Sequence, residues 1–268
     1  MNQEIKVSII VPCYNSEKYL PETIKSILSQ SFKFWECVFV NDGSIDGTEN
    51  VILNAVSLDK RFRYISQNNK GVCIARNTAI GVSRGKYILC LDADDLISEN
   101  FIEETVKILD KNLEVKVVAS TVRFFGRKKG ILTPLSYNIP TMLASNQLVV
   151  TSLFRKIDFD RVEGFNENMK DGLEDWDFWI SILKNGGKVE RCEQAVFFYR
   201  ILKKSRNSEM AKVNMFKLRL QMWENHKELY SKYFVAPTSY SEYQSIEKSK
   251  EYRLGKLLLA PVRKILGK

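Results

Sequence analysis

The chain has 268 residues, of which 44% are hydrophobic, as expected of a globular protein with a substantial core. Its net charge of +9 is confined to the last quarter, because residues 1–202 hold 26 basic and 26 acidic residues, whereas residues 203–268 hold 15 and six. The sequence has neither a run of roughly 18 apolar residues nor a signal-peptide pattern. Because the basic excess is limited to the last quarter, we expect no nucleic-acid partner. The lack of a membrane span and of a signal peptide predicts a cytoplasmic protein, free or bound peripherally on the cytoplasmic face of the membrane.

Short apolar runs alternate with amphipathic segments over the first 110 residues. The predicted strands cover residues 6–12, 35–40, 63–65 and 87–91, and the predicted helices cover residues 20–28, a segment ending near 58, 71–83 and 98–109. Strands that alternate with helices form parallel βαβ units with right-handed crossovers. This part of the chain therefore predicts an α/β fold with a mainly parallel sheet.

The pattern changes after residue 110. The predicted elements are strands over 115–120, 149–154 and 195–199, a hairpin over 121–133 that turns at 126–130, and helices over 173–183 and 208–233. The alternation of strand and helix is thus less regular in this half of the chain.

Three carboxylates, Asp92, Asp94 and Asp95, follow the predicted strand over 87–91. In an extended chain Asp92 and Asp94 would face one side and Asp95 the other. Clustered carboxylates repel one another unless a cation compensates, and oxygen ligands without His or Cys suit Mg²⁺ or Mn²⁺. The alternative is an Asp-rich turn that caps the next helix.

Three further loops follow predicted strands and contain residues suited to a nucleotide. Tyr14 offers a flat face for a base, Asp42 an acceptor for a base or ribose donor, and Arg76 a cation for a diphosphate. Neither GxGxxG nor GxxxxGK[ST] occurs, so a dinucleotide fingerprint and a P-loop are excluded. The alternatives are a packing aromatic at Tyr14, an Asx turn at Asp42 and a solvated helix residue at Arg76.

Four segments together resemble the family-2 glycosyltransferases: SIIVPCYN at 8–15, VNDGSIDGT at 40–48, GVCIARN at 71–77 and LDADD at 91–95. The match in order and spacing covers about residues 6–110 and continues more weakly to about 205. The resemblance implies a GT-A fold, with a Rossmann-like twisted sheet and flanking helices. It also implies inverting transfer of a sugar from a nucleoside diphosphate, most commonly UDP. It divides the chain into a nucleotide-sugar-binding half (1–115), an acceptor-binding half of the same domain (116–205) and a basic helical tail (206–268).

The resemblance also implies roles for individual residues. Asp94 would bind the Mn²⁺ or Mg²⁺ of the DxD motif, and Asp175, next to Glu174, would be the catalytic base that accepts the proton of the acceptor hydroxyl. The residues that would bind the nucleotide sugar are Pro12, Tyr14, Asp42, Arg76 on the diphosphate and Asp92 on the ribose side. Asp95 is expected to support the loop.

The pKa of Asp175 is subject to opposing effects. A helix N-terminus lowers the pKa of a carboxyl group, whereas burial beside Trp176 and the like charge of Asp177 would raise it toward the value that suits a base near neutral pH. The alternative is that these acids only cap the helix.

Leu202 departs from the resemblance, because many relatives carry there a His that can complete the metal site. Metal affinity could then be weak, and Lys203 and Lys204 could supply charge near the phosphates instead. Among the aromatic residues, Trp176 and Trp179 could form a platform for a sugar acceptor, but their helical spacing favours packing in the core.

His226 is the single histidine, and we expect it on the surface of its predicted helix. The five cysteines are isolated and lie mostly in apolar segments, which indicates buried thiols in a reducing compartment. With these spacings and one histidine, the sequence does not favour a zinc site.

The segment from residue 252 to the end interleaves leucines with basic residues on a helix that contains Pro261. A basic amphipathic helix fits an anionic membrane surface and would suit a lipid-linked acceptor, and packing onto the catalytic domain is the alternative. The expected partners are therefore a UDP-linked or other nucleoside diphosphate sugar, a glycan or lipid-linked saccharide acceptor, and an anionic membrane.

Two other functions stay open on the sequence. A sugar-nucleotide-binding module without catalysis would be compatible with the missing histidine at Leu202. A sugar-1-phosphate nucleotidyltransferase would share the nucleotide-binding sheet, but it would need a glycine-rich basic loop where VPCYN stands at 11–15.

Overall fold

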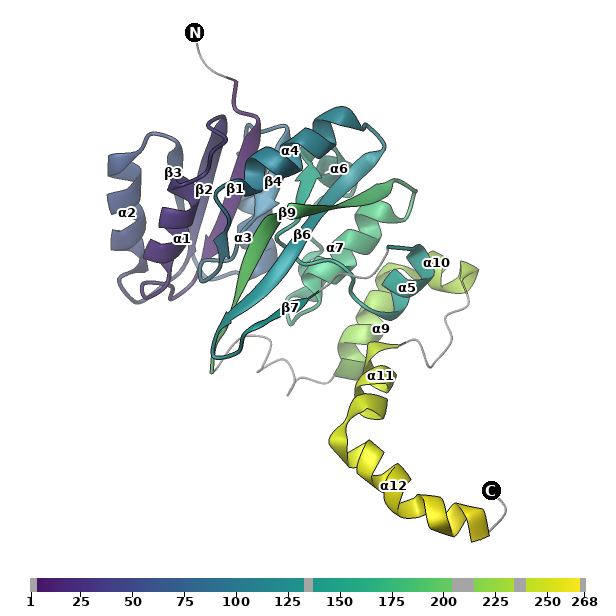
Figure 1. The fold of residues 1–268 in the computed structure, drawn as a ribbon. Helices are drawn as coiled ribbons and strands as arrows, with labels where there is room; N and C mark the ends of the chain where they lie inside the picture. Colours follow the sequence, from purple (N-terminus) through teal and green to yellow (C-terminus); the bar gives the residue numbers. More distant parts are fainter. Residues whose placement is uncertain (1–3, 133–136, 204–214, 234–239, 266–268) are drawn as a thin grey trace.

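The computed structural model describes residues 4–132, 137–203, 215–233 and 240–265. Its described strands form a nine-stranded mixed sheet in the order β3-β2-β1-β4-β8-β6-β9-β5, with β7 paired to β6 (Figure 1). The strands are β1 (Val7–Cys13), β2 (Trp35–Asp42), β3 (Phe62–Gln67), β4 (Tyr87–Cys90), β5 (Leu96–Ile97), β6 (Val115–Gly126), β7 (Gly130–Leu132), β8 (Leu153–Arg155) and β9 (Lys188–Ile201).

Helices cover both faces of this sheet (Figure 1). One face carries α1 (Leu20–Leu28), α2 (Thr48–Leu58) and α4 (Phe101–Lys111). The other carries α3 (Val72–Gly81), α5 (Ile139–Ala144), α6 (Lys156–Arg161), the 3-10 turn η1 (Glu167–Met169) and α7 (Glu174–Leu183). Strand residues alternate between the two apolar layers: Ile9 packs with the first and Ile10 with the second. The fold is the three-layer α/β arrangement that the alternating pattern predicts.

The first four strands place the candidate loops at one edge. β1 pairs in parallel with β2 and with β4, and β2 pairs in parallel with β3. The loops that follow β1, β2 and β4 therefore leave the sheet at the same edge. This edge is where open α/β sheets bind ligands.

The second half of the sheet differs in extent from the prediction. β6 continues without interruption into the first arm of the predicted hairpin, which turns between β6 and β7 as expected. β9 is longer than the predicted strand over 195–199, because its first residues pair in parallel with β6. β8 is shorter than the predicted strand over 149–154, and it pairs antiparallel with both β4 and β6.

The C-terminal segment contains α9 (Met215–Asn225), α10 (Lys227–Lys232), α11 (Ser241–Lys248) and α12 (Lys250–Ile265). The single helix predicted over 208–233 is interrupted at His226, and its residues 208–214 lie outside the described part. Leu218 and Met222 of α9 are buried, and Met222 belongs to the core that contains α7. By contrast, α11 and α12 extend away from the body (Figure 1). Within the described ranges, none of the helices has the length and apolar character needed to cross a membrane.

Candidate active site

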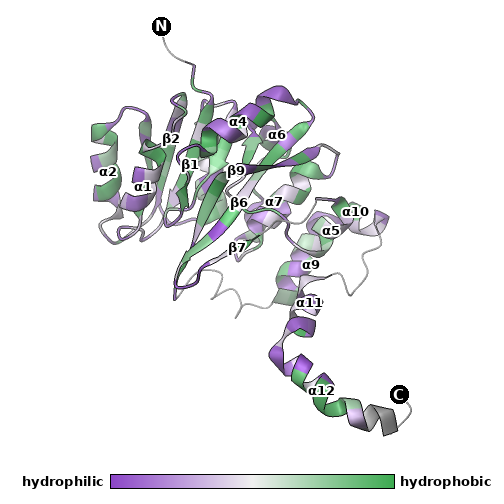
Figure 2. Cartoon of the chain, viewed as in Figure 1, coloured by the Kyte–Doolittle hydropathy of each residue, from purple (hydrophilic) through white to green (hydrophobic). Residues whose placement is uncertain are grey.

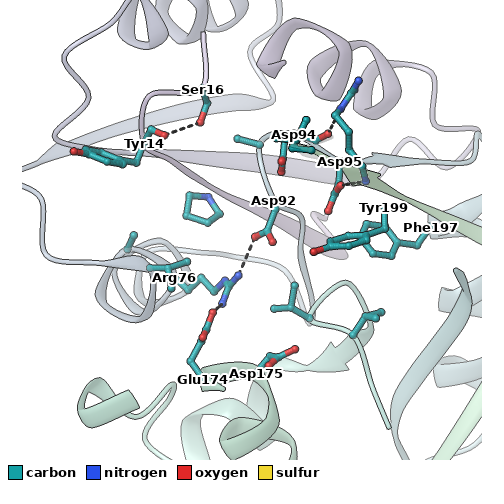
Figure 3. A pocket seen from close by; sticks show the side chains of 18 of the residues that line it. Tyr14, Ser16, Arg76, Asp92, Asp94, Asp95, Glu174, Asp175, Phe197 and Tyr199 are labelled. Atoms are coloured by element: carbon teal, nitrogen blue, oxygen red, sulfur yellow. Dashed lines mark hydrogen bonds and ion pairs between the residues drawn. The ribbon is translucent and has the colours of Figure 1, made fainter. Parts of the chain in front are cut away.

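A cavity of about 1130 Å³ opens at the carboxyl ends of β1, β2 and β4 (Figure 3). All seven site residues predicted from the sequence line it: Pro12, Tyr14, Asp42, Arg76, Asp92, Asp94 and Asp175. The remaining wall comes from β6, β9, the N-terminus of α7 and the segment that follows α5. This volume lies at the upper end of the usual range for ligand sites and is large enough for a nucleotide sugar.

The loops after β1 and β2 are joined by hydrogen bonds. Ile45 N donates to Asn15 Oδ1 at 2.9 Å, and Asn15 N donates to Ser44 Oγ at 3.0 Å. Asn15 has a φ of 49°, a left-handed conformation that asparagine tolerates better than most residues. Beside it, the side chain of Tyr14 is 52% exposed. Tyr14 is therefore not the packing aromatic of the alternative interpretation, and its ring is available at the rim of the cavity.

Asp42 is buried at the end of β2 and holds the loop before α3. Its Oδ1 accepts hydrogen bonds from the backbone N of Lys70 at 2.9 Å and from Gln67 Nε2 at 2.7 Å, and its Oδ2 accepts from Gly71 N at 2.9 Å. These donors lie 25 to 29 residues away in sequence. The alternative interpretation, in which Asp42 forms an Asx turn with its neighbouring backbone, is therefore wrong. A carboxylate offers about four acceptor positions, and one is left for a ligand.

Arg76 is only 2% exposed and joins the two halves of the cavity (Figure 3). Its Nη2 donates to Asp92 Oδ1 at 2.8 Å, and its Nη1 donates to Glu174 Oε1 at 3.1 Å. Burial opposes the charge of the guanidinium, but Asp92 and Glu174 more than compensate and raise the pKa of Arg76 above its ordinary value. Arg76 is therefore not a solvated helix residue. Its two ion pairs link the nucleotide side of the cavity to the N-terminus of α7.

The three carboxylates after β4 lie in a turn, in which Asp95 N donates to Asp92 O. The expectation of an extended chain with alternating side chains is wrong here, because the strand ends at Cys90. Asp95 is buried and accepts a hydrogen bond from the backbone N of Arg200 at 2.7 Å, which confirms its expected supporting role. Asp94 lines the cavity, and burial together with the charge of Asp92 raises its pKa to about 6.

The residues after β4 fit a divalent cation. The charge of Asp92 raises the electrostatic cost of ionising Asp94, and a cation held at Asp94 would relieve it. Over residues 4–132, 137–203, 215–233 and 240–265 there is no group of three or more His, Cys, Asp or Glu residues that could hold a metal alone. Leu202 lines the cavity and offers no ligand. The site suits Mg²⁺ or Mn²⁺ that draws most of its ligands from substrate phosphates and water.

Asp175 is the second residue of α7, on the wall opposite Asp92 (Figure 3). Burial, followed by the adjacent charge of Glu174, raises its pKa to about 7. Arg76 and hydrogen bonds from Trp176 N at 2.8 Å and Asn146 Nδ2 at 3.2 Å oppose this rise without cancelling it. The expected direction is thus confirmed, although the neighbouring charge is Glu174 and not Asp177. A pKa near neutrality suits a general base.

The two tryptophans of α7, Trp176 and Trp179, are 4% and 0% exposed. They therefore pack in the core, as their helical spacing favoured, and form no platform for a sugar.

His226 is 5% exposed, so the expected surface position is wrong. Its Nε2 lies 2.9 Å from Asp177 Oδ1, which also accepts from Asn225 Nδ2 at 2.8 Å. A buried partner on α7 therefore determines where His226 lies.

Arg200 at the end of β9 is a site residue that the sequence pattern did not reveal. Its Nε donates to the backbone O of Asp94 at 2.7 Å, and its guanidinium lies over the rings of Phe125 and Tyr19. Together with the bond from its backbone N to Asp95, these contacts fix the turn that carries Asp94. Its position directly after a predicted strand was the signal that could have identified it.

The fold and the cavity define an α/β protein that holds a nucleotide-sized site at the carboxyl ends of its strands, the arrangement of GT-A glycosyltransferases. A model described as glycosyl transferase family 2 matches residues 8–164, and one described as N-terminal domain of galactosyltransferase matches residues 144–205. The chain belongs to glycosyl transferase family 2.

Relatives with this similarity differ widely in length. Chondroitin synthase of Escherichia coli is 32% identical over 187 residues, which are 67% of this chain and 27% of that protein. Glycosyltransferase GlyA of Streptococcus pneumoniae is 39% identical over 102 residues, 38% of this chain and 15% of that protein. A putative teichuronic acid biosynthesis glycosyltransferase, TuaG of Bacillus subtilis, is 26% identical over 239 residues, 87% of this chain and 91% of that protein. The chain thus spans about a quarter or less of the first two.

Solved structures support the fold. Residues 1–349 of TarS of S. aureus, in complex with UDP-GlcNAc, superpose with a TM-score of 0.69 at 19% identity, over 82% of this chain and 66% of that one. The mannosyltransferase PcManGT of Pyrobaculum calidifontis, in complex with GDP-Man and Mn²⁺, gives a TM-score of 0.60 at 17% identity, over 98% of this chain and 88% of that one. The expected GT-A fold, with its twisted sheet and flanking helices, is confirmed.

Proposed function

We propose that this protein is an inverting glycosyltransferase that moves a sugar from UDP to a hydroxyl group of a glycan or lipid-linked acceptor during synthesis of a cell-surface polysaccharide. One observation carries the proposal. Asp175, with its pKa raised to about 7, faces the same cavity as the acidic turn at Asp92 and Asp94. A base and a diphosphate site in one cavity are what a single displacement requires.

On the donor side, Tyr14 and Pro12 contact the nucleoside base and Asp42 accepts a hydrogen bond from the base or ribose. Asp92 faces the ribose side, and Arg76 contributes its buried positive charge to the wall nearest the diphosphate. Because both Nη atoms of Arg76 already bind carboxylates, its contribution is a fixed charge together with the alignment of Asp92. The UDP assignment draws on TarS, whose structures hold UDP and UDP-GlcNAc.

On the acceptor side, the proposed chemistry is one displacement. The acceptor hydroxyl loses its proton to the Asp175 carboxylate while its oxygen forms a bond to the anomeric carbon of the donor. The bond from that carbon to the diphosphate oxygen breaks, and the nucleoside diphosphate leaves with the electron pair. Attack on the face opposite to the leaving group inverts the configuration. Asn146, which donates to Asp175 Oδ2, helps to orient this carboxylate toward the acceptor.

Asp94 would hold Mn²⁺ or Mg²⁺ together with the donor diphosphate. When bound, such an ion stabilises the negative charge that grows on the leaving diphosphate. The Mn²⁺ in the PcManGT structure supports the use of a divalent ion, and Leu202 is consistent with weak affinity in the absence of nucleotide. Lys203 is exposed next to Leu202 and is available to supplement the charge, whereas Lys204 lies outside the described residues.

Two alternatives have specific signatures. A nucleotide-binding module without catalysis would bind UDP but leave the donor intact, and the raised pKa of Asp175 argues against it. A sugar-1-phosphate nucleotidyltransferase would release diphosphate from a nucleoside triphosphate. The loop after β1 carries Tyr14 and Asn15 without a basic residue before Lys18, which does not suit a triphosphate.

We further propose that residues 1–115 bind the donor and 116–205 the acceptor, and that the protein acts in the cytoplasm, peripherally on the cytoplasmic face of the membrane. Asp42, Arg76 and Asp92 lie in the first part and Asp175 in the second, which supports the division. The third part, 206–268, includes α9, whose Met222 packs into the core, so the projecting tail begins later than residue 206.

Isothermal titration calorimetry with UDP, with and without Mn²⁺, tests the donor half of this proposal. The expected result is binding that Mn²⁺ strengthens at least tenfold and that Asp94→Asn makes insensitive to Mn²⁺. Asp171→Asn, an exposed carboxylate outside the cavity, is the matched control and should bind like the native protein. Binding that ignores both Mn²⁺ and Asp94 would contradict the assigned role of Asp94.

A further inference from the structure

The helix α12 exposes apolar side chains that a folded protein normally covers. Leu254, Leu257 and Leu258 are 56%, 72% and 65% exposed, and they share one face of the helix because they are three and four residues apart. The alternative of packing onto the catalytic domain is therefore wrong for these residues. Figure 2 shows the apolar segment on a helix that stands clear of the body.

Basic residues surround this apolar face. Residues 248–268 hold seven Lys or Arg residues and one acidic residue. Arg253 and Lys256 lie on the described part of the helix, and both are exposed. In the sequence, Arg253 precedes Leu254 and Lys256 follows it. An exposed apolar stripe with a strongly positive surround is complementary to the headgroup region of an anionic bilayer.

The base of this helix is fixed to the body. Arg219 of α9 donates through Nη2 to Glu242 Oε2 at 2.7 Å and to the backbone O of Ala144 at 2.8 Å. The Arg219 guanidinium also lies 4.0 Å above the ring of Trp176, which belongs to α7. The start of α11, which leads directly into α12, is therefore tied to the helix that carries Asp175.

A second element with the same character projects at the same end of the molecule (Figure 1). The turn between β6 and β7 exposes Arg127, Lys128 and Lys129, and it is followed by Ile131 and Leu132, which are 62% and 44% exposed. Leu132 also lines the cavity. The rim of the cavity thus continues into a basic and apolar hairpin tip.

We propose that α12 and the β6–β7 tip together form a docking surface for an anionic lipid bilayer, with the leucines of α12 inserted among the headgroups. Because Leu132 belongs both to this surface and to the cavity wall, docking places the acceptor half of the cavity at the lipid surface. The choice of acceptor rests on the proposed function: an acceptor site at the lipid surface selects a lipid-linked saccharide over a free glycan.

Cosedimentation of the full chain with lipid vesicles tests the surface without any donor or acceptor. The expected result is binding to phosphatidylcholine vesicles that contain phosphatidylglycerol, little binding to pure phosphatidylcholine, and weakening by at least tenfold when salt is raised to about 0.5 M. Leu257→Asp with Leu258→Asp, and separately Lys128→Glu with Lys129→Glu, should each weaken binding at least tenfold. Leu58→Asp and Lys60→Glu are controls, because these exposed residues lie at the end of α2, outside the proposed surface, and both should bind normally.

Each contrary outcome identifies what is wrong. Binding that is equal for neutral and anionic vesicles, or absent at low salt, overturns the proposal. If light scattering instead shows a dimer that Leu257→Asp dissociates, with no vesicle binding, the face covers a second copy and the membrane assignment fails. Release of UDP from a donor, measured on the same samples, reports separately on the transferase proposal, so either can fail alone.

Discussion

Replacing Asp175 with asparagine should change activity and stability in opposite directions. The asparagine keeps the size of the side chain, and its single amide oxygen can still accept the hydrogen bond from Trp176 N. Its NH₂ group replaces the oxygen that accepts from Asn146, and it cannot accept a proton. Loss of a general base typically costs about 10²–10⁴-fold in rate. In the native protein, UDP release from a donor with water as acceptor should fall about tenfold for each pH unit below about 7, and this dependence should vanish in the variant.

The stability effect follows from the same raised pKa. Between the ordinary value of 3.8 and about 7, the folded protein binds more protons than the unfolded chain, so the contribution of Asp175 to stability decreases as pH rises through this window. For a completely buried carboxyl group with this pKa, ionisation would reduce the free energy of unfolding at pH 8 by about 4 kcal/mol. Since Asp175 is partly exposed and shares its surroundings with Glu174, about 1–2 kcal/mol is expected.

Thermal unfolding at two pH values measures this cost. At pH 8 the Asp175→Asn protein should melt about 2–5 °C above the native protein, and near pH 4 the two should converge. The control Asp171→Asn, at an exposed carboxylate three residues before α7, should leave both the melting temperature and the rate unchanged. A variant that is less stable at pH 8, or whose rate still falls below about pH 7, would refute the assignment of Asp175 as a base with a raised pKa.

Three other substitutions test the supports of the site. Arg76→Met removes the buried guanidinium that binds Asp92 and Glu174 and should cost about 3–5 kcal/mol in urea unfolding. Arg84→Met removes an exposed guanidinium from Glu36, which stays bound to Arg63 and Ser8, and should cost under about 1 kcal/mol; similar costs for the two variants would contradict the buried clamp. His226→Phe removes the imidazole that faces Asp177 and should cost about 1–3 kcal/mol by the same measurement, an effect that a surface histidine would not produce. Gly43→Ala introduces a Cβ 2.7 Å from Asn69 N at a φ of +74°, so it should weaken UDP binding in calorimetry at least tenfold, and unchanged affinity would show that this loop does not shape the nucleoside site.

The donor half of the cavity could be predicted because its determinants are local. The apolar run before Asp92 is a strand buried on both faces, and a parallel sheet brings the ends of such strands to one edge whatever their distance in sequence. The residues at those ends, Tyr14, Asp42 and Asp94, consequently line one cavity as expected.

What the sequence could not show depends on pairing between distant residues. His226 is buried because it contacts Asp177, which lies 49 residues earlier in the sequence. The residues around His226 in its own helix do not indicate this contact. The two ion pairs of Arg76 span 16 and 98 residues. The early part of β9 is largely polar and exposed, so it lacks a strand pattern of its own and is extended through its pairing with β6.

The proposed inverting transfer is tested most directly by incubating the protein and Mn²⁺ with a panel of nucleotide sugars and following nucleoside diphosphate release. For the donor that turns over, proton NMR of the released sugar before mutarotation reports the configuration at the anomeric carbon. Inverting transfer by this site should give release that depends on Asp175 and a β-configured sugar from an α-linked donor. Release with retained configuration, or at an undiminished rate in Asp175→Asn, would contradict it.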